Sequence, residues 1–85
     1  MSEITLLITE NQIDTLIRST KEDFPNESCS LLLGSIVDDE YHVKVLKKME
    51  NKAQSEYSFH MDSDELMKVY KWASDNGLDV VGVYH

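Results

Sequence analysis

Two side chains in this sequence are placed where a folded domain could use them for chemistry. Glu27 lies just before an apolar run that begins at Ser28, and His85 follows the apolar run 78–84. A carboxylate at the mouth of a buried strand is held in place and can pass a proton between water and a leaving group. The plain alternatives are a solvated loop carboxylate and an exposed or structural histidine at a strand end.

Three other residues have reactive or metal-binding side chains, and we expect none of them to act in catalysis. Cys29 falls two residues after Glu27, on the same side of the predicted strand, but a thiol nucleophile needs a neighbouring base. We therefore interpret Cys29 as a buried core cysteine. His42 and His60 have no acidic or cysteine partner at metal-ligand spacing, so neither is predicted to bind a metal ion.

The elements that position these residues follow from apolar periodicity and turn residues. Strands are predicted over residues 3–8, 28–37, 41–49, 57–61 and 78–84. Helices are predicted over 9–24 and 62–76. The fold class is therefore α/β of the α+β type, a mixed sheet with two flanking helices in the order β-α-β-β-β-α-β. The last strand is apolar on both faces and lacks a second neighbour in this order, so the fold is expected to be incomplete at its carboxyl end.

Composition restricts the classes of partner. Eighty-five residues make one domain at most, and the formal net charge is −8. Binding to a phosphate backbone depends on clustered Lys and Arg, so no nucleic acid partner is expected. No apolar run reaches the roughly 18 residues of a membrane helix, and the amino terminus lacks the positive start of a signal peptide. Because a single cysteine fits a reducing compartment, we expect a cytoplasmic protein with no membrane partner.

Three segments, taken in order, resemble the JAMM metalloprotease family, also called the JAB or MPN family. They are Pro25-Asn26-Glu27-Ser28-Cys29 with the following Leu31-Leu32-Leu33-Gly34; Asn51 with the later Phe59 and Asp62; and Val80-Val81-Gly82-Val83-Tyr84-His85. The resemblance covers nearly the whole chain. Ser30 is a departure, because the family commonly has glycine there. The resemblance implies one partial MPN domain over residues 1–85, with a core like that of the cytidine deaminases.

The resemblance also implies a role for each of the two candidate site residues. Glu27 matches the family glutamate that works on water held by a zinc ion. His85 matches the first histidine of the His-x-His-Pro pair that holds the zinc together with a later aspartate. The implied activity is that of a zinc-dependent isopeptidase or peptidase, in which zinc-bound water attacks the carbonyl and Glu27 shuttles the proton. The implied substrates are conjugates of ubiquitin-like or small sulfur-carrier proteins.

Two expectations concern the chain as it stands. It should bind zinc weakly and be inactive, because a catalytic zinc takes three protein ligands and His85 supplies one. Its last strand should be an exposed apolar edge through which two copies form a homodimer. Two alternatives remain open: a metal-free MPN-like scaffold module that binds a protein partner, and an unrelated small α/β domain in which Glu27 is merely solvated.

Overall fold

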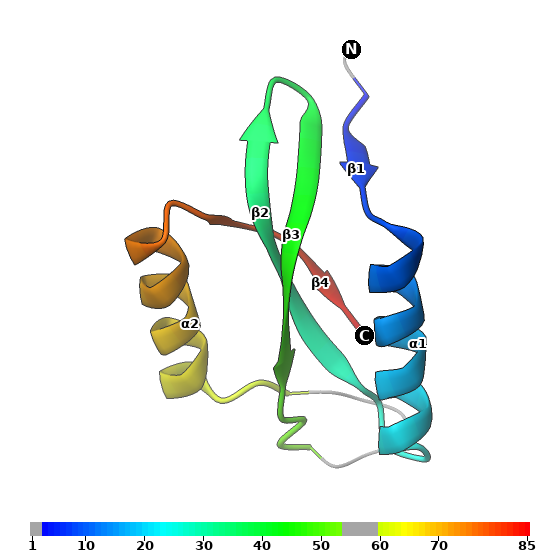
Figure 1. Cartoon of the computed structure of the whole chain (residues 1–85). Coiled ribbons are helices and arrows are strands. Elements are labelled where there is room, and N and C mark those ends of the chain that lie inside the picture. The colour runs from blue at the N-terminus through cyan, green and yellow to red at the C-terminus, as the bar shows by residue number, and fades with distance from the viewer. Residues whose placement is uncertain (1–2, 54–59) are drawn as a thin grey trace.

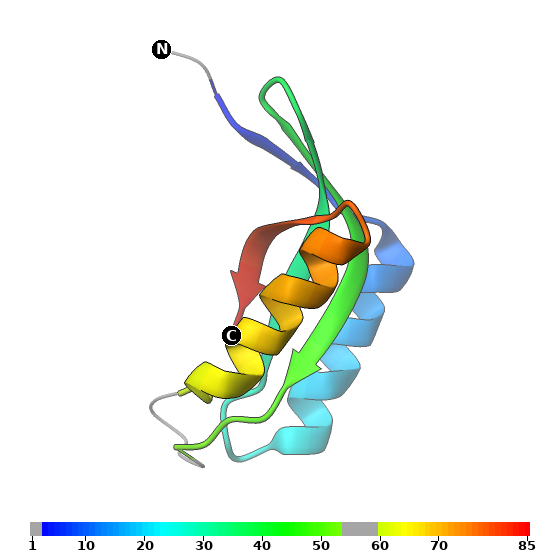
Figure 2. The same ribbon diagram turned by 90° about the vertical axis from the view of Figure 1, so that its left-hand side faces the viewer.

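The computed structural model describes residues 3–53 and 60–85. Its elements, in chain order, are β1 (Thr5–Leu7), α1 (Glu10–Asp23), β2 (Cys29–Val37), β3 (Glu40–Met49), α2 (Ser63–Asp75) and β4 (Asp79–Tyr84) (Figure 1). The strands form one mixed sheet, and the two helices cover its opposite faces, as the perpendicular views in Figures 1 and 2 show together. The predicted α+β class, with a mixed sheet and two flanking helices, is confirmed.

The sheet has the strand order β1-β3-β2-β4. Strand β2 is flanked by β3 and β4, both antiparallel to it, and β1 pairs with β3 in parallel. A tight turn at Asp38 and Asp39 joins β2 to β3, and Asp38 has a φ of 54°, a left-handed conformation that aspartate tolerates better than most residues. Strands β2 and β3 thus form a hairpin, and the other side of β2 pairs with β4.

Alternation along β2 divides the core between the two helices. The face towards α2 is filled by alternate residues of β2 and by two residues of α2, namely Cys29, Leu31, Leu33, Val69 and Ala73. On the opposite face, Leu32 packs with Leu16 of α1 and Val81 of β4. Because successive strand residues point to opposite faces, burial on both faces explains why this strand is an unbroken apolar run.

The backbones of β2 and β3 approach each other closely at Gly34. The pairing register shifts between Leu33 and Gly34. A Cβ atom at Gly34 would lie 1.7 Å from the carbonyl oxygen of His42 on β3. Only glycine fits this approach, which explains the glycine inside an otherwise apolar strand.

Both helices begin at the residues that the sequence indicates. Thr9 and Gln12 form a reciprocal capping box, with N–H to side-chain oxygen distances of 2.9 and 3.1 Å. Asp62 caps α2 and accepts a hydrogen bond from the N–H of Glu65 at 3.1 Å. Gln12 also donates from Nε2 to the carbonyl oxygen of Val43 at 3.0 Å, which ties α1 to β3.

The strand predicted over 57–61 is not part of the described sheet. Residues 57–59 lie outside the described residues, and His60 and Met61 belong to no strand. The described order is therefore β-α-β-β-α-β.

Only one residue of α1, Leu16, is buried. Leu16 is 5% exposed, whereas Ile13 and Ile17 are 41% and 45% exposed. Leu16 is the one residue of α1 in the buried cluster on that face of the sheet, and Ile13 and Ile17 lie outside this cluster. Neither α1 nor α2 is long and apolar enough to cross a membrane.

Candidate functional site

Strand pairing brings Glu27 and His85 to the same place. Glu27 lies in the short loop between α1 and β2, and His85 directly follows β4. The antiparallel register sets Ser30 of β2 opposite Tyr84 of β4. Continued by one residue, this register sets His85 opposite Cys29, and Glu27 lies two residues before Cys29 on the same face. The start of β2 thus meets the end of β4.

The two side chains are in contact range. The Nδ1 atom of His85 lies 3.7 Å from the Oε1 atom of Glu27. This distance is longer than a hydrogen bond, and it makes an ion pair when the imidazole is protonated. The side chain of Glu27 is 28% exposed and that of His85 is 51% exposed. The structure therefore brings together the two residues that the sequence singled out, in a site that water can reach.

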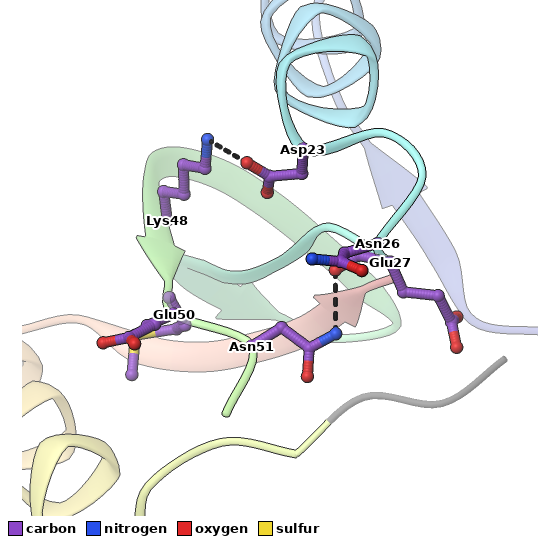
Figure 3. A pocket seen from close by; sticks show the side chains of 7 residues that line it. Asp23, Asn26, Glu27, Lys48, Glu50 and Asn51 are labelled. Atoms are coloured by element: carbon purple, nitrogen blue, oxygen red, sulfur yellow. Dashed lines mark hydrogen bonds and ion pairs between the residues drawn. The ribbon is translucent and has the colours of Figure 1, made fainter. Parts of the chain in front are cut away.

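An open pocket of about 460 Å³ lies beside Glu27, between the loop before β2 and the end of β3 (Figure 3). It is lined by Asp23, Asn26, Glu27, Lys48, Met49, Glu50 and Asn51. Asn51 donates from Nδ2 to the main-chain carbonyl oxygen of Glu27 at 3.0 Å, a contact drawn as a dashed line in Figure 3. In the sequence Asn51 is marked only by the family resemblance, which gives it no role. The one further indication of Asn51 in the sequence is that its amide side chain comes just after a predicted strand.

A second pocket, of about 450 Å³, lies beside His85. It is lined by Leu31, His60, Met61, Leu66, Tyr70, Val83 and His85. The lining is mostly apolar, with two imidazoles. His60, for which no metal role was predicted, therefore shares a pocket with His85, a neighbourhood that spacing in the sequence does not indicate.

Side-chain contacts also hold the elements that carry the site. The hydroxyl oxygens of Thr20 on α1 and Tyr84 on β4 are 2.5 Å apart, which fixes the residue before His85. Lys48 of β3 donates to the carboxylate of Asp23 at the end of α1 at 3.2 Å (Figure 3). This hydrogen bond raises the pKa of Lys48, although the pair is partly solvated and contributes little to stability.

Cys29 is a core residue, as the sequence predicts. Its side chain is fully buried, and Sγ donates weakly to the carbonyl oxygen of Met49 at 3.5 Å. Burial, with smaller contributions from the charges of Asp23 and Glu27, raises the pKa of Cys29. A neutral, enclosed thiol is a poor nucleophile.

His42 lies close to the β2–β3 turn rather than at the site. Its Nε2 atom is 3.4 Å from Oε1 of Glu40, the first residue of β3. The structure therefore gives His42 a local surface contact and does not bring it to Glu27.

Among the described residues, the side chains around Glu27 and His85 offer too few donors for a zinc ion. A catalytic zinc takes three protein ligands. Across residues 3–53 and 60–85, no three or more His, Cys, Asp and Glu side chains are grouped so that they could hold a metal ion. The described residues therefore do not by themselves fit the zinc that the family resemblance implies.

A glutamate before β2 and a histidine after β4, on an α+β sheet with a helix on each face, are the arrangement that the resemblance to the JAB family implies. The family model described as prokaryotic homologues of the JAB domain matches residues 9–85. The chain belongs to this family, which confirms the resemblance seen in the sequence.

The chain is also similar to individual proteins. A desampylase from Pyrococcus furiosus is 27% identical over 81 residues, which cover 95% of this chain and 54% of that protein. A protein from Desulfitobacterium hafniense, known from its solution structure, is 31% identical with a TM-score of 0.80, over 94% of this chain and 53% of that one. The chain thus spans about half the length of these relatives.

Proposed function

We propose that this chain forms the amino-terminal half of a JAMM-type isopeptidase, with Glu27 and His85 in one active site. The observation that carries this proposal is the 3.7 Å approach of the two side chains in a chain of the JAB family. The desampylase relative, as its name says, removes a protein modifier. By analogy, the substrates of this protein are conjugates of a ubiquitin-like or small sulfur-carrier protein.

Glu27 is the proton shuttle in this proposal. Its carboxylate accepts a proton from the attacking water and returns it to the amine that leaves when the C–N bond breaks. The position supports the task, because the neighbouring strand β2 holds the main chain while the side chain stays partly exposed to water.

His85 would supply one imidazole nitrogen to a bound metal ion, and a zinc ion held there would supply Lewis-acid chemistry. Since the described residues do not complete a zinc site, the remaining ligands would come from outside them. The chain as it stands is therefore expected to bind zinc weakly and to be inactive. Its cytoplasmic location stays a prediction.

A metal-free module that binds a protein partner is the second candidate. It is favoured by the incomplete donor set among the described residues and by the apolar pocket beside β4. This candidate predicts binding of a ubiquitin-like protein without cleavage and without stoichiometric zinc.

The experiment that separates the candidates uses the protein as its gene encodes it, with whatever follows the His85 codon. Zinc content and cleavage of a lysine-linked conjugate of a ubiquitin-like protein are measured together. Glu27→Gln keeps the side-chain shape but cannot accept the proton, so it should lower kcat by about 10²–10⁴-fold with zinc content unchanged. Glu10→Gln, on the exposed first turn of α1, is the matched control and should keep full activity.

Full activity of Glu27→Gln would contradict the proton-shuttle role. A wild-type protein that binds the modifier but neither contains zinc nor cleaves would support the scaffold module instead.

A further inference from the structure

We infer that Asn51 is a positioning residue for Glu27, an inference that rests on the proposed role of Glu27. Asn51 lies two residues after the end of β3. Its Nδ2 atom donates to the carbonyl oxygen of Glu27 at 3.0 Å, and Figure 3 shows this bond crossing from the end of β3 to the loop before β2. The main chain of the loop that presents the carboxylate is thus tied to the segment that follows β3.

The oxygen of the same amide is also used. Asn51 Oδ1 accepts hydrogen bonds from the N–H groups of Ala53 at 3.0 Å and His60 at 2.9 Å. Beside it, the N–H of Lys52 donates to the carbonyl oxygen of His60 at 2.7 Å. Because a carbonyl oxygen only accepts and an N–H only donates, one orientation of the amide satisfies all of these partners. Asn51 is therefore held in a defined orientation.

These contacts connect the two sides of the site. Asn51 is bonded to Glu27 on one side and to His60 on the other, and His60 lines the same pocket as His85. The amide thereby ties the main chain of Glu27 to the segment that contributes His60 to the pocket beside His85. A reacting group displaced by about 1 Å can lose about 10²-fold in rate, so such a tether matters to catalysis even though it touches no substrate.

Two substitutions separate positioning from general stability. Asn51→Asp keeps an oxygen for the N–H groups of Ala53 and His60 but loses the donor to Glu27, whereas Asn51→Ala loses both. The matched control is Asn76→Asp at the end of α2, where Nδ2 donates to the carbonyl oxygen of Trp72 at 2.8 Å. It makes the same chemical change, from amide to carboxylate, away from Glu27.

The readout is backbone dynamics of the ¹⁵N-labelled 85-residue chain by NMR. In both Asn51 variants the order parameter of the Glu27 amide should fall from about 0.85 to below about 0.6. In Asn51→Asp the amides of Ala53 and His60 should keep their protection from hydrogen exchange, and in Asn51→Ala they should lose it. Asn76→Asp should leave Glu27 unchanged.

An unchanged order parameter at Glu27 in Asn51→Asp would overturn the inference. Global unfolding of the Asn51→Asp variant would also overturn the inference, because Asn51 would then contribute to general stability and not to positioning. If only the Asn51→Ala variant fails to fold, the order parameter measured in Asn51→Asp decides the question. The measurement needs no substrate, so its failure is distinct from failure of the proposed function. If the order parameter of the Glu27 amide falls as expected but Glu27→Gln retains full activity, Asn51 still positions the Glu27 loop, and the proton-shuttle role of Glu27 is wrong.

Discussion

The imidazole of His85 and the carboxylate of Glu27 lie 3.7 Å apart because the start of β2 meets the end of β4. The two residues lie far apart in the sequence, and no local element contains both. Any change that shifts β4 along β2 by one residue would turn one of them to the other face of the sheet. The geometry of the site therefore depends on the register of this strand pair.

The contact between Tyr84 and Thr20 should stabilise that register. The hydroxyl oxygens lie 2.5 Å apart, between the end of β4 and α1. Tyr84→Phe removes the hydrogen bond and should lower the free energy of unfolding by about 0.5–1.5 kcal/mol, measured by urea denaturation. Tyr70→Phe, on a half-exposed ring of α2, is the control. Equal losses in the two variants would show that the Thr20 contact adds nothing.

The thiol of Cys29 should react slowly with thiol reagents in the folded chain. Burial is the main cause of its pKa lying above the ordinary value of 9.0, followed by the charges of Asp23 and Glu27. The unfolded thiol ionises first as the pH rises, so the contribution of this group to stability is complete below about pH 9 and is lost above it. At pH 7 the reaction of a thiol reagent with the folded chain should be slower, by about tenfold or more, than its reaction with the unfolded chain.

Cys29 is the one cysteine in the sequence, so the thiol signal has a single source. Equal reaction rates in the folded and unfolded chain would mean that the start of β2 is open, against the buried position of Cys29.

Gly34→Ala should destabilise the hairpin strongly. The added Cβ would lie 1.7 Å from the carbonyl oxygen of His42, a main-chain atom that cannot rotate away. We expect a loss of about 1–3 kcal/mol or more in the free energy of unfolding, as for other overpacked positions. Gly77→Ala is the comparison, because nothing lies within 4 Å there and its φ of 67° alone costs about 1–2 kcal/mol. A smaller loss at Gly34 than at Gly77 would contradict the close strand approach.

Whether a feature of the fold or the site could be predicted from the sequence depends on how far apart in the chain its residues lie. Local signals were sufficient for the capping box at Thr9 and narrowed the cap of α2 to Asp62 or Ser63, because each cap involves residues three apart. Family resemblance picked out Glu27 and His85 but not their separation, which arises from pairing of β2 with β4. The hydrogen bond from Asn51 to Glu27 joins two loops distant in sequence and leaves no periodic pattern. The exposure of Ile17 likewise depends on how α1 meets the sheet.

The edge at β4 should make the chain associate with itself. Within the described residues β4 pairs with β2 alone, and Val83 on this strand is 49% exposed. We expect concentration-dependent dimers in sedimentation, because an unpaired apolar edge is a template for another strand. Val83→Lys should abolish them, and Met67→Lys, on the exposed surface of α2, should not. A wild-type chain that stays monomeric at high concentration would contradict this prediction.

The most direct test of the central claim is to read the coding sequence past the His85 codon. The family resemblance implies that Ser-His-Pro or a similar tripeptide with a central histidine follows, with an aspartate further along. These residues would complete the three protein ligands of a catalytic zinc. Glu27 and His85 would then lie in one complete metal site. A stop codon directly after His85 would leave the site without the three protein ligands of a catalytic zinc. That result would contradict the enzyme and leave the protein-binding module as the function of this chain.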